Sequence, residues 1–334
     1  MKRILIIQTG GTIAMQIKDS AGYTQTSPHP SDFLENRIPE LSGIAHIEII
    51  DLFFKDSSDM NPADWITLAE TINENYTSFD GFVILHGTDT MAYTASALSF
   101  CLNNLGKPVI LTGSQIPMAV IRSDASRNLI NAIEMATMPL NEVAICFNDH
   151  IFRGNRSTKS SAGDFDAFSS PNYPPLADIG LNISLNYQIT PSPAKFGITP
   201  GFDNRVFLIR LFPGLNPDNL LKLIGPDIRA IIVEAFGCGN FPGSGRHSLL
   251  PFFEKCLEQD ILLVIGSQAL QDAADLSKYE SGRMAQSLGI ISAGDMTTEA
   301  SLTKMMYLLA MHDNHLAVRD LYNRPIAGEI TVKS

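Results

Sequence analysis

Several features that would mark a specialised class of protein are scarce or absent in this chain of 334 residues. Its four cysteines include no C-x-x-C pair, so neither a zinc ribbon nor a dense disulfide framework is expected. No apolar run approaches the ~20 residues that cross a bilayer. Lys and Arg number 24 against 35 Asp and Glu, a net charge of −11, and no basic cluster stands out. Nucleic acid and anionic membranes, which attract positive patches, are therefore not expected as partners.

A secretory leader is also not expected. The amino terminus starts with a basic pair and an apolar run, but that run stops at Ile7, which is too short for the core of a signal peptide. The cysteines stand in apolar surroundings and are predicted to be buried free thiols in a reducing cytoplasm: Cys101, Cys146, Cys238 and Cys256.

What the chain does contain is typical of a globular protein: 45% hydrophobic and 18% charged residues. Short β-branched apolar runs alternate with helical patterns, which predicts a parallel sheet covered on both faces, a doubly wound α/β domain. The expected strands are 4–7, 47–50, 82–85, 109–111 and 143–147, and the expected helices start at Pro62 and span 91–105 and 123–136. The first of these helices should bury Trp65, Leu68, Ala69 and Ile72.

A second, smaller α/β domain is predicted after an irregular stretch. Regular periodicity disappears over 149–204, where Ser, Asn, Pro and Gly dominate. Alternation returns with strands at 206–211, 230–233 and 262–265, a helix at 248–258 and a helical region at 298–311. We therefore expect a larger, catalytic α/β domain over 1–189, an extended Pro-containing linker over 190–205 and the smaller domain over 206–334.

Polar residues collect where the expected strands of the first domain end, the place where open parallel sheets bind ligands. Five loops qualify: 9–12, 56–59, 86–90, 113–115 and 153–159. Glycine turns and hydroxyl caps explain any one of them, but a cap needs only one hydroxyl and two of these loops carry several. Clustered hydroxyls with a carboxylate and a lysine suit nucleophilic acyl chemistry, although they could instead bind a phosphate.

The usual motifs for other chemistries are missing. Neither G-x-x-x-x-G-K-[ST] nor G-x-G-x-x-G occurs between a strand and a helix, and no G-x-S-x-G elbow is present. His312 and His315, expected on one terminal helix, lack the H-E-x-x-H pattern, and Asp164 and Asp166 are interpreted as loop carboxylates. No metal and no cofactor are expected.

Two of the loops resemble known signatures. Residues 9–14 (TGGTIA) and 86–91 (HGTDTM) resemble the two motifs of bacterial-type L-asparaginases, the asparaginase/glutaminase family. The resemblance covers essentially the whole chain, including 56–60, 113–117 and 294–297, and the segment 153–159 is most similar to the cytoplasmic type I branch. It implies hydrolysis of L-asparagine to L-aspartate and ammonia without a cofactor.

The resemblance also implies roles in catalysis. Thr12 is the nucleophile that forms an acyl-enzyme, which water then hydrolyses, and Tyr23 hydrogen-bonds Thr12 from a mobile lid. Thr88, Asp89 and Lys159 form a second triad, in which the lysine draws a proton through Thr88 and the carboxylate orients the lysine. That role requires Lys159 to be partly desolvated.

Substrate-binding roles follow in the same way. Asp89 pairs with the α-ammonium, Ser57 and Ser58 hold the α-carboxylate, and backbone N–H groups including that of Thr88 stabilise the oxyanion. Asn240 matches a residue that the family sends into the site of a neighbouring subunit, which implies a homodimer or homotetramer.

Some positions depart from the family pattern. Type II members often carry glutamine where Ser58 stands, so the choice between asparagine and glutamine stays open, with asparagine expected. The family's second-subunit glutamate has no clear match. Glu234 and Ala269 do not resemble the residues around the effector site of some type I members, so allosteric control is not implied.

Three alternatives remain. The amidase subunit of archaeal glutamyl-tRNA amidotransferase shares both threonine motifs but carries an extra amino-terminal domain, whereas the first strand is expected here at Arg3. An amino-acid sensor could use the same serines and Asp89 but would not need Thr12, Thr88 and Lys159 together. A phosphate-binding transferase would require a nucleotide and magnesium. The hydrolase is the preferred interpretation.

Overall fold

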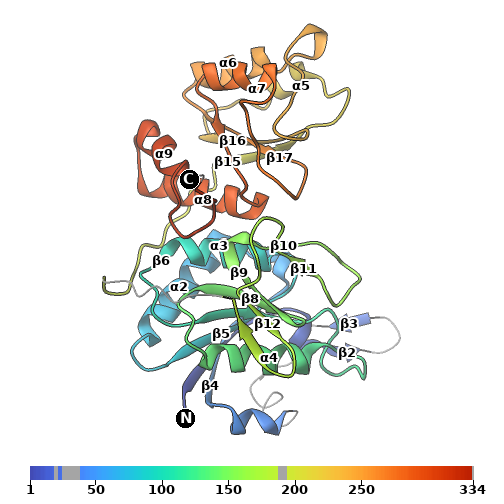
Figure 1. The fold of residues 1–334 in the computed structure, drawn as a ribbon, viewed down its shortest axis with the longest axis vertical. Coiled ribbons are helices and arrows are strands. Elements are labelled where there is room, and N and C mark those ends of the chain that lie inside the picture. Colours follow the sequence, from blue (N-terminus) through green and yellow to red (C-terminus); the bar gives the residue numbers. More distant parts are fainter. Residues whose placement is uncertain (19–21, 25–37, 187–193, 333–334) are drawn as a thin grey trace. The chain divides into compact units, whose positions relative to one another are not determined.

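The structure is a computed structural model that describes residues 1–18, 22–24, 38–186 and 194–332. The chain divides into two compact units, Met1–Pro200 and Gly201–Ser334, shown in Figure 1. In the described parts of both units, no helix is long and apolar enough to cross a membrane. Part of the predicted linker, 190–193, lies outside the described residues.

The first unit is built on an eight-stranded sheet with the order β13-β12-β9-β8-β7-β5-β1-β4. Five adjacent strands, predicted from their apolar runs and ending at the edge strand β4, are parallel: β1 (Arg3–Gly10), β4 (His46–Lys55), β5 (Gly81–Leu85), β7 (Val109–Thr112) and β8 (Val143–Phe147). The direction in which successive strands are added to the sheet reverses at β1. The next strand in the chain, β4, lies on one side of β1, whereas β5, β7 and β8 lie on the other side. Ligands bind beside such a reversal, so the loops after β1 and β5 flank the expected crevice.

Helices cover both faces of this sheet, which confirms the predicted doubly wound arrangement (Figure 1). On one face, α4 (Ala125–Thr137) packs Leu129 and Ile133 against Ile6 and Val83. On the other, α3 (Met91–Cys101) lies against β7 and β8, with α2 (Pro62–Asn75) beside it.

The helix α2 begins as the sequence predicts. Pro62 occupies the first turn, where its missing N–H costs nothing, and Asn61 and Asp64 form a reciprocal capping box. The predicted core side chains Trp65, Leu68, Ala69 and Ile72 are all buried.

Two predictions for the first unit were wrong. The helix α3 ends at Cys101 rather than at residue 105, because the chain turns into β6 (Leu102–Asn103), which pairs with β14 (Gly197–Ile198). The stretch 149–204 is not irregular throughout. Besides β14, the described residues of this stretch, 149–186 and 194–204, form five further strands: β9 (His150–Arg153), β10 (Thr158–Lys159), β11 (Phe168–Ser169), β12 (Ala177–Ile179) and β13 (Ile183–Leu185). Strands of two to four residues are held by backbone hydrogen bonds and are too short to show a side-chain period.

The second unit has a smaller parallel sheet with the order β15-β16-β17-β18. Its strands are β15 (Val206–Arg210), β16 (Ala230–Ala235), β17 (Leu262–Ser267) and β18 (Ile291–Ser292). The helices are α5 (Pro217–Leu221), α6 (Leu250–Glu258), α7 (Glu280–Ser287), α8 (Thr298–Met311) and α9 (His315–Tyr322). The sequence predicted the first three strands, α6 and α8, whereas β18, α5, α7 and α9 were missed.

Short elements complete both units: β2 (Gln16–Lys18), β3 (Gly22–Thr24), η1 (Thr12–Ala14), η3 (Pro39–Gly43), η4 (Ser57–Asp59), η5 (Gly154–Arg156) and η6 (Gly245–His247).

All four thiols are free, but only three are buried. The exception is Cys238, which is half-exposed and corrects the prediction of four buried thiols. It lies between Gly237 and Gly239, whose positive φ angles turn the chain at this point.

Candidate active site

Glycines bring three of the polar loops into backbone contact. A Cβ atom on Gly11 would lie 2.4 Å from the Gly87 nitrogen, and one on Gly87 would lie 2.7 Å from the Ser57 side chain. Neither side chain could fit, and Gly11 also has a φ of +82°, which other residues rarely adopt. The loops after β1, β4 and β5 therefore meet only because these two positions carry no side chain.

Thr12 follows directly after this contact. It begins η1 and is half-buried, and the Gly11 N–H donates to Lys55 O at 3.1 Å, which ties the end of β1 to β4. Tyr23, the predicted partner of Thr12, lies on β3, but its side chain is outside the described residues.

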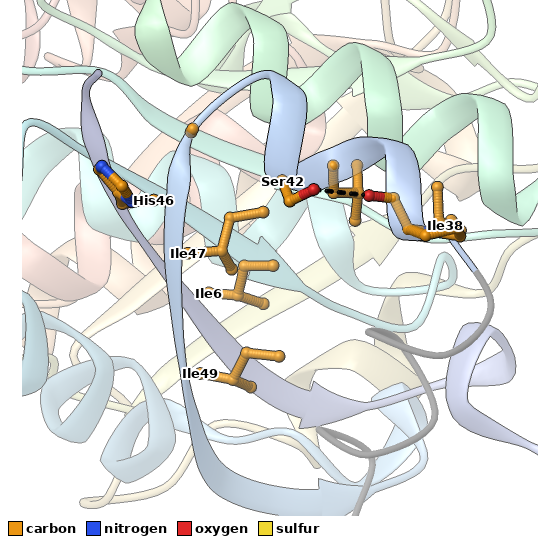
Figure 2. Close-up of a pocket in the computed structure, with 9 residues that line it drawn as sticks. Ile6, Ile38, Ser42, His46, Ile47 and Ile49 are labelled. Carbon is orange, nitrogen blue, oxygen red and sulfur yellow. Dashed lines mark hydrogen bonds between the residues drawn. The ribbon is translucent and has the colours of Figure 1, made fainter.

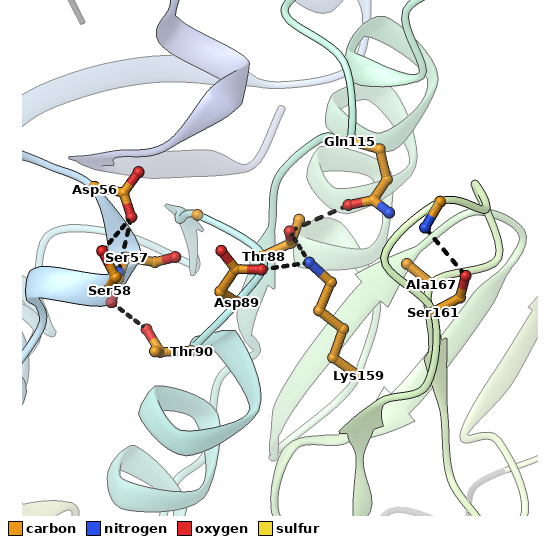
Figure 3. A network of polar contacts seen from close by, with 12 residues as sticks. Asp56, Ser57, Ser58, Thr88, Asp89, Thr90, Gln115, Lys159, Ser161 and Ala167 are labelled. Atoms are coloured by element: carbon orange, nitrogen blue, oxygen red, sulfur yellow. Dashed lines mark hydrogen bonds and ion pairs between the residues drawn. The ribbon is translucent and has the colours of Figure 1, made fainter.

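Lys159 joins the loop after β5 from the strand β10. Its Nζ donates to Thr88 Oγ1 at 2.7 Å and to Asp89 Oδ1 at 2.6 Å (Figure 3). The side chain of Lys159 is 16% exposed, whereas that of Asp89 is 68% exposed. The structure thus brings together the three predicted triad residues, with the lysine mostly withdrawn from solvent and one face of the carboxylate open to it.

Gln115 is a member of this cluster that the sequence did not single out. The Thr88 hydroxyl donates to Gln115 Oε1 at 3.2 Å, and Gln115 Nε2 donates to the Asp164 backbone oxygen at 3.0 Å. The buried carboxylate of Asp124 accepts from the backbone N–H groups of Gln115 and Ile116 and so fixes this loop. A loop glutamine after a strand is too common a feature to have indicated this contact.

The two serines differ in their surroundings. Ser57 is buried, and its backbone oxygen accepts from Thr90 Oγ1 at 2.7 Å. Ser58 is exposed and donates both its N–H and its hydroxyl to Asp56 Oδ1, at 2.9 and 2.8 Å (Figure 3). The backbone hydrogen bond from Ser58, followed by that from its hydroxyl, holds the pKa of the Asp56 carboxyl below its usual range. Both serines stand on η4, beside the loop that carries Thr88 and Asp89.

Asn240 belongs to the second unit. It closes a tight turn with Phe236, and its Oδ1 accepts from Ser281 Oγ at 2.6 Å. A role for Asn240 across a subunit interface stays a prediction.

A separate cavity of about 360 Å³ lies in the first unit between η3 and β4 (Figure 2). Its lining is mainly aliphatic and includes Ile6, Ile38, Ile47 and Ile49. The Ser42 hydroxyl at its edge already donates to Pro39 O at 2.8 Å. This cavity lacks the paired charges that would hold a zwitterion, and it contains none of the predicted site residues.

The histidine pair is arranged differently from the prediction. His312 caps the carboxyl end of α8 and His315 begins α9, so the two do not share one helix. Among the residues that the structure describes, no group of three or more His, Cys, Asp or Glu side chains could hold a metal ion.

The fold and the site together define a class of protein, the α/β enzymes that transfer acyl groups through a hydroxyl. The open sheet carries a cluster of hydroxyl, carboxylate and lysine side chains at the point where its strand order reverses, and this arrangement suits such chemistry. Comparison with known families agrees. Residues 3–191 match the family model "Asparaginase, N-terminal", and residues 205–322 match "Glutaminase/Asparaginase C-terminal domain". The chain therefore belongs to the asparaginase/glutaminase family.

Individual relatives match over nearly the full chain. L-asparaginase 1 of Escherichia coli is 40% identical over 340 residues, covering 99% of this chain and 98% of its own length. The structure of L-asparaginase I from Vibrio cholerae has a TM-score of 0.90 at 40% identity and covers 99% of each chain. That of the thermostable L-asparaginase from Thermococcus kodakarensis has a TM-score of 0.91 at 36% identity and covers 99% of this chain and all of its own.

Proposed function

We propose that this protein is an L-asparaginase, an amidohydrolase that converts L-asparagine and water to L-aspartate and ammonia. One observation carries the proposal: Lys159 Nζ lies within hydrogen-bond distance of both Thr88 Oγ1 and Asp89 Oδ1, beside the loop that holds Thr12. A hydroxyl within reach of a positioned amine is what proton transfer in acyl chemistry requires. Relatives named L-asparaginase match essentially the whole chain.

Acylation is the first step of the proposed reaction. The Thr12 hydroxyl oxygen attacks the side-chain amide carbon of asparagine, and a tetrahedral intermediate forms. The bond from carbon to nitrogen then breaks, and the nitrogen leaves as ammonia with the proton that Thr12 has lost. Tyr23, in this proposal, hydrogen-bonds the Thr12 oxygen during the attack.

Hydrolysis of the resulting ester is the second step. Water attacks the acyl carbon, the product carboxyl group is released, and Thr12 regains its proton. In this step Lys159 draws the proton of the attacking water through Thr88, and the same proton is passed on to the Thr12 oxygen as the ester bond breaks. This requires a neutral amine and a turn of the Thr88 hydroxyl hydrogen from Gln115 to Nζ. The present hydrogen bonds support this route, because Thr88 Oγ1 contacts Gln115 and Lys159 at once, at 3.2 and 2.7 Å.

The zwitterionic backbone of the substrate needs two charged or polar contacts. Asp89, whose carboxylate is largely exposed while one oxygen binds Lys159, is the proposed partner of the α-ammonium. Ser57 and Ser58 are the proposed partners of the α-carboxylate. The Thr88 N–H is proposed to stabilise the oxyanion, and within the described parts of the chain it donates no hydrogen bond.

The assembly and location proposed for the protein are a homodimer or homotetramer in the cytoplasm. Asn240 would then enter the site of a neighbouring subunit. Analytical ultracentrifugation of the purified protein tests the assembly, and a monomer with full activity would contradict this part of the proposal.

The test of the activity is ammonia release from L-asparagine and L-glutamine by purified protein without added cofactor. Thr12→Ala and Thr88→Val should lose activity by orders of magnitude while remaining folded. Thr67→Val is the matched control, because the Thr67 hydroxyl only donates to Ala63 O of its own helix, at 3.0 Å. One methylene in the substrate is worth ~1–3 kcal/mol of discrimination, so the ratio of the two substrates is measured, with asparagine expected to be preferred.

Two results would overturn the proposal. If the folded protein binds asparagine but releases no ammonia, it is an amino-acid sensor. If ammonia release depends on glutamyl-tRNA, it is the amidase of a tRNA-dependent amidotransferase.

A further inference from the structure

A buried chain of hydrogen bonds ends at the peptide group before Thr88. Trp65 Nε1 donates to Thr94 Oγ1 at 3.1 Å, Thr94 Oγ1 contacts His86 Nε2 at 2.9 Å, and His86 Nδ1 contacts the Gly87 backbone oxygen at 2.7 Å. His86 and Thr94 are fully buried and Trp65 nearly so. His86 therefore has no access to a substrate, although it belongs to the same loop as Thr88.

The chemistry of the groups fixes the direction of every hydrogen bond in this chain. An indole N–H only donates and a carbonyl oxygen only accepts. The Thr94 hydroxyl therefore accepts a hydrogen bond from Trp65 and donates its own hydrogen to His86 Nε2. His86 Nδ1 must then carry the ring proton and donate the hydrogen bond to the Gly87 oxygen. Burial lowers the pKa of His86 to about 4, so the ring is neutral near pH 7 and has a single proton to place.

The orientation of the Gly87 oxygen determines that of the Thr88 N–H. The peptide bond between them is trans, and in a planar trans peptide the C=O and the following N–H point in opposite directions. Because His86 Nδ1 holds the Gly87 oxygen, the Thr88 N–H is directed away from the buried histidine. This N–H has no acceptor among the residues that the structure describes.

We propose that His86 is a positioning residue for the oxyanion site, which fixes the Gly87–Thr88 peptide so that the Thr88 N–H points at the reacting amide oxygen. Thr94 and Trp65 secure the tautomer that performs this task. The inference rests on the proposed function, in which the Thr88 N–H stabilises the negative charge of the tetrahedral intermediate. Since that charge develops during the reaction, the effect of His86 falls on kcat rather than on substrate affinity.

Three variants of the hydrogen-bonded residues, two at His86 and one at Thr94 of α3, test the inference. His86→Leu removes both ring nitrogens at similar volume, and His86→Asn places an amide N–H donor near the position of Nδ1. Thr94→Val removes the hydroxyl that donates to Nε2 and that so keeps the ring proton on Nδ1. His46→Leu, on an exposed position of β4, is the matched control. For each variant, kcat and KM for L-asparagine are measured, together with the Kd for L-aspartate and thermal unfolding.

Loss of one oxyanion donor typically lowers kcat by about 10²–10³-fold. His86→Leu is expected to approach that loss, with KM and the aspartate Kd within about threefold of the parent, and His86→Asn to recover most of it. A kcat that His86→Leu leaves unchanged, or an equal loss in His86→Asn and His86→Leu, would overturn the inference. A parent protein that releases no ammonia would instead overturn the proposed function.

The tautomer gives a second measurement, which is independent of whether His86→Leu folds. In 15N-histidine-labelled parent protein, the nitrogen resonances of His86 should report a neutral ring protonated at Nδ1 from pH 6 to pH 9. Thr94→Val should reduce that preference and lower kcat. A ring protonated at Nε2 in the parent protein would refute the proposed hydrogen-bond direction.

Discussion

The second unit contains a buried ion pair that ties the end of the chain to α8. The side chains of Lys304 and Glu329 form this pair, and neither has any exposed surface. Lys304 Nζ also donates to the backbone oxygens of Tyr322 and Arg324, each at 2.7 Å. The Glu329 carboxylate accepts from backbone N–H groups at 326 and 327. We predict that Lys304→Met destabilises the second unit strongly.

The size of the effect follows from burial. Methionine fills much of the space of the lysine side chain but leaves Glu329 as a buried charge without its partner. Removing one partner of a buried ion pair typically lowers the free energy of unfolding by about 3–5 kcal/mol. The same substitution at Lys255 is the control, because its pair with Glu258 at 2.9 Å is exposed, with 48% and 66% of the two side chains accessible. Exposed pairs contribute about 0–1 kcal/mol.

Hydrogen exchange of the α8 amides is the appropriate assay. It reports the opening of this unit alone, whereas a single thermal transition would combine two units. With 1.4 kcal/mol for each tenfold change, protection in Lys304→Met should fall by about two to three and a half orders of magnitude. The double variant Lys304→Met with Glu329→Leu should recover much of the loss, because no charge is then left unpaired. If Lys304→Met and Lys255→Met show equal protection, the reasoning is refuted.

Two further predictions concern charged side chains in the two units. Lys159→Met should lower kcat by about 10²–10⁴-fold, because the proposed proton acceptor is lost. The free energy of unfolding should change by less than about 1 kcal/mol, since the exposed carboxylate of Asp89 is then hydrated by water. Ammonia release measures the first quantity and urea unfolding the second, and an inactive variant that is also largely unfolded would contradict this prediction. Asp203 has its pKa lowered to about 2, chiefly by hydrogen bonding from Arg205. Because the folded pKa lies below the unfolded value of 3.8, Asp203 stabilises the protein above about pH 4 and loses this effect as the pH falls toward 2. Asp203→Asn should therefore be less stable than the parent at pH 6, and the difference should shrink below pH 4; a difference that stays constant over this range would disprove the assignment.

The sequence predicted β1, β5, β7 and β8 because these strands are buried on both faces. Continuous apolar runs such as 143–147 can be recognised without knowledge of their neighbours. The helix α8 was predicted with its observed limits, Thr298–Met311, and the start of α2 was given by Pro62.

The short antiparallel strands could not be predicted from the sequence pattern. β9, β12 and β13 extend the large sheet through backbone pairing, which leaves little trace in residues of mixed polarity. The early end of α3 has the same cause, since residues 102–103 are drawn into a pair with Gly197–Ile198, nearly a hundred positions later.

The candidate site shows the same division. By itself, the sequence determined which polar loop follows which strand along the first unit. Because the carboxyl ends of parallel strands share one edge of a sheet, it also determined the edge at which Thr12, Thr88 and Asp89 collect. The family resemblance implied that Lys159 joins Thr88 and Asp89, but only the tertiary structure gave the contacts themselves, made from a strand 70 positions away in the chain. It also gave Gln115 and His86 their contacts. Hydrogen bonds depend on distance and direction to a fraction of an ångström, and these are set by packing that no local pattern records.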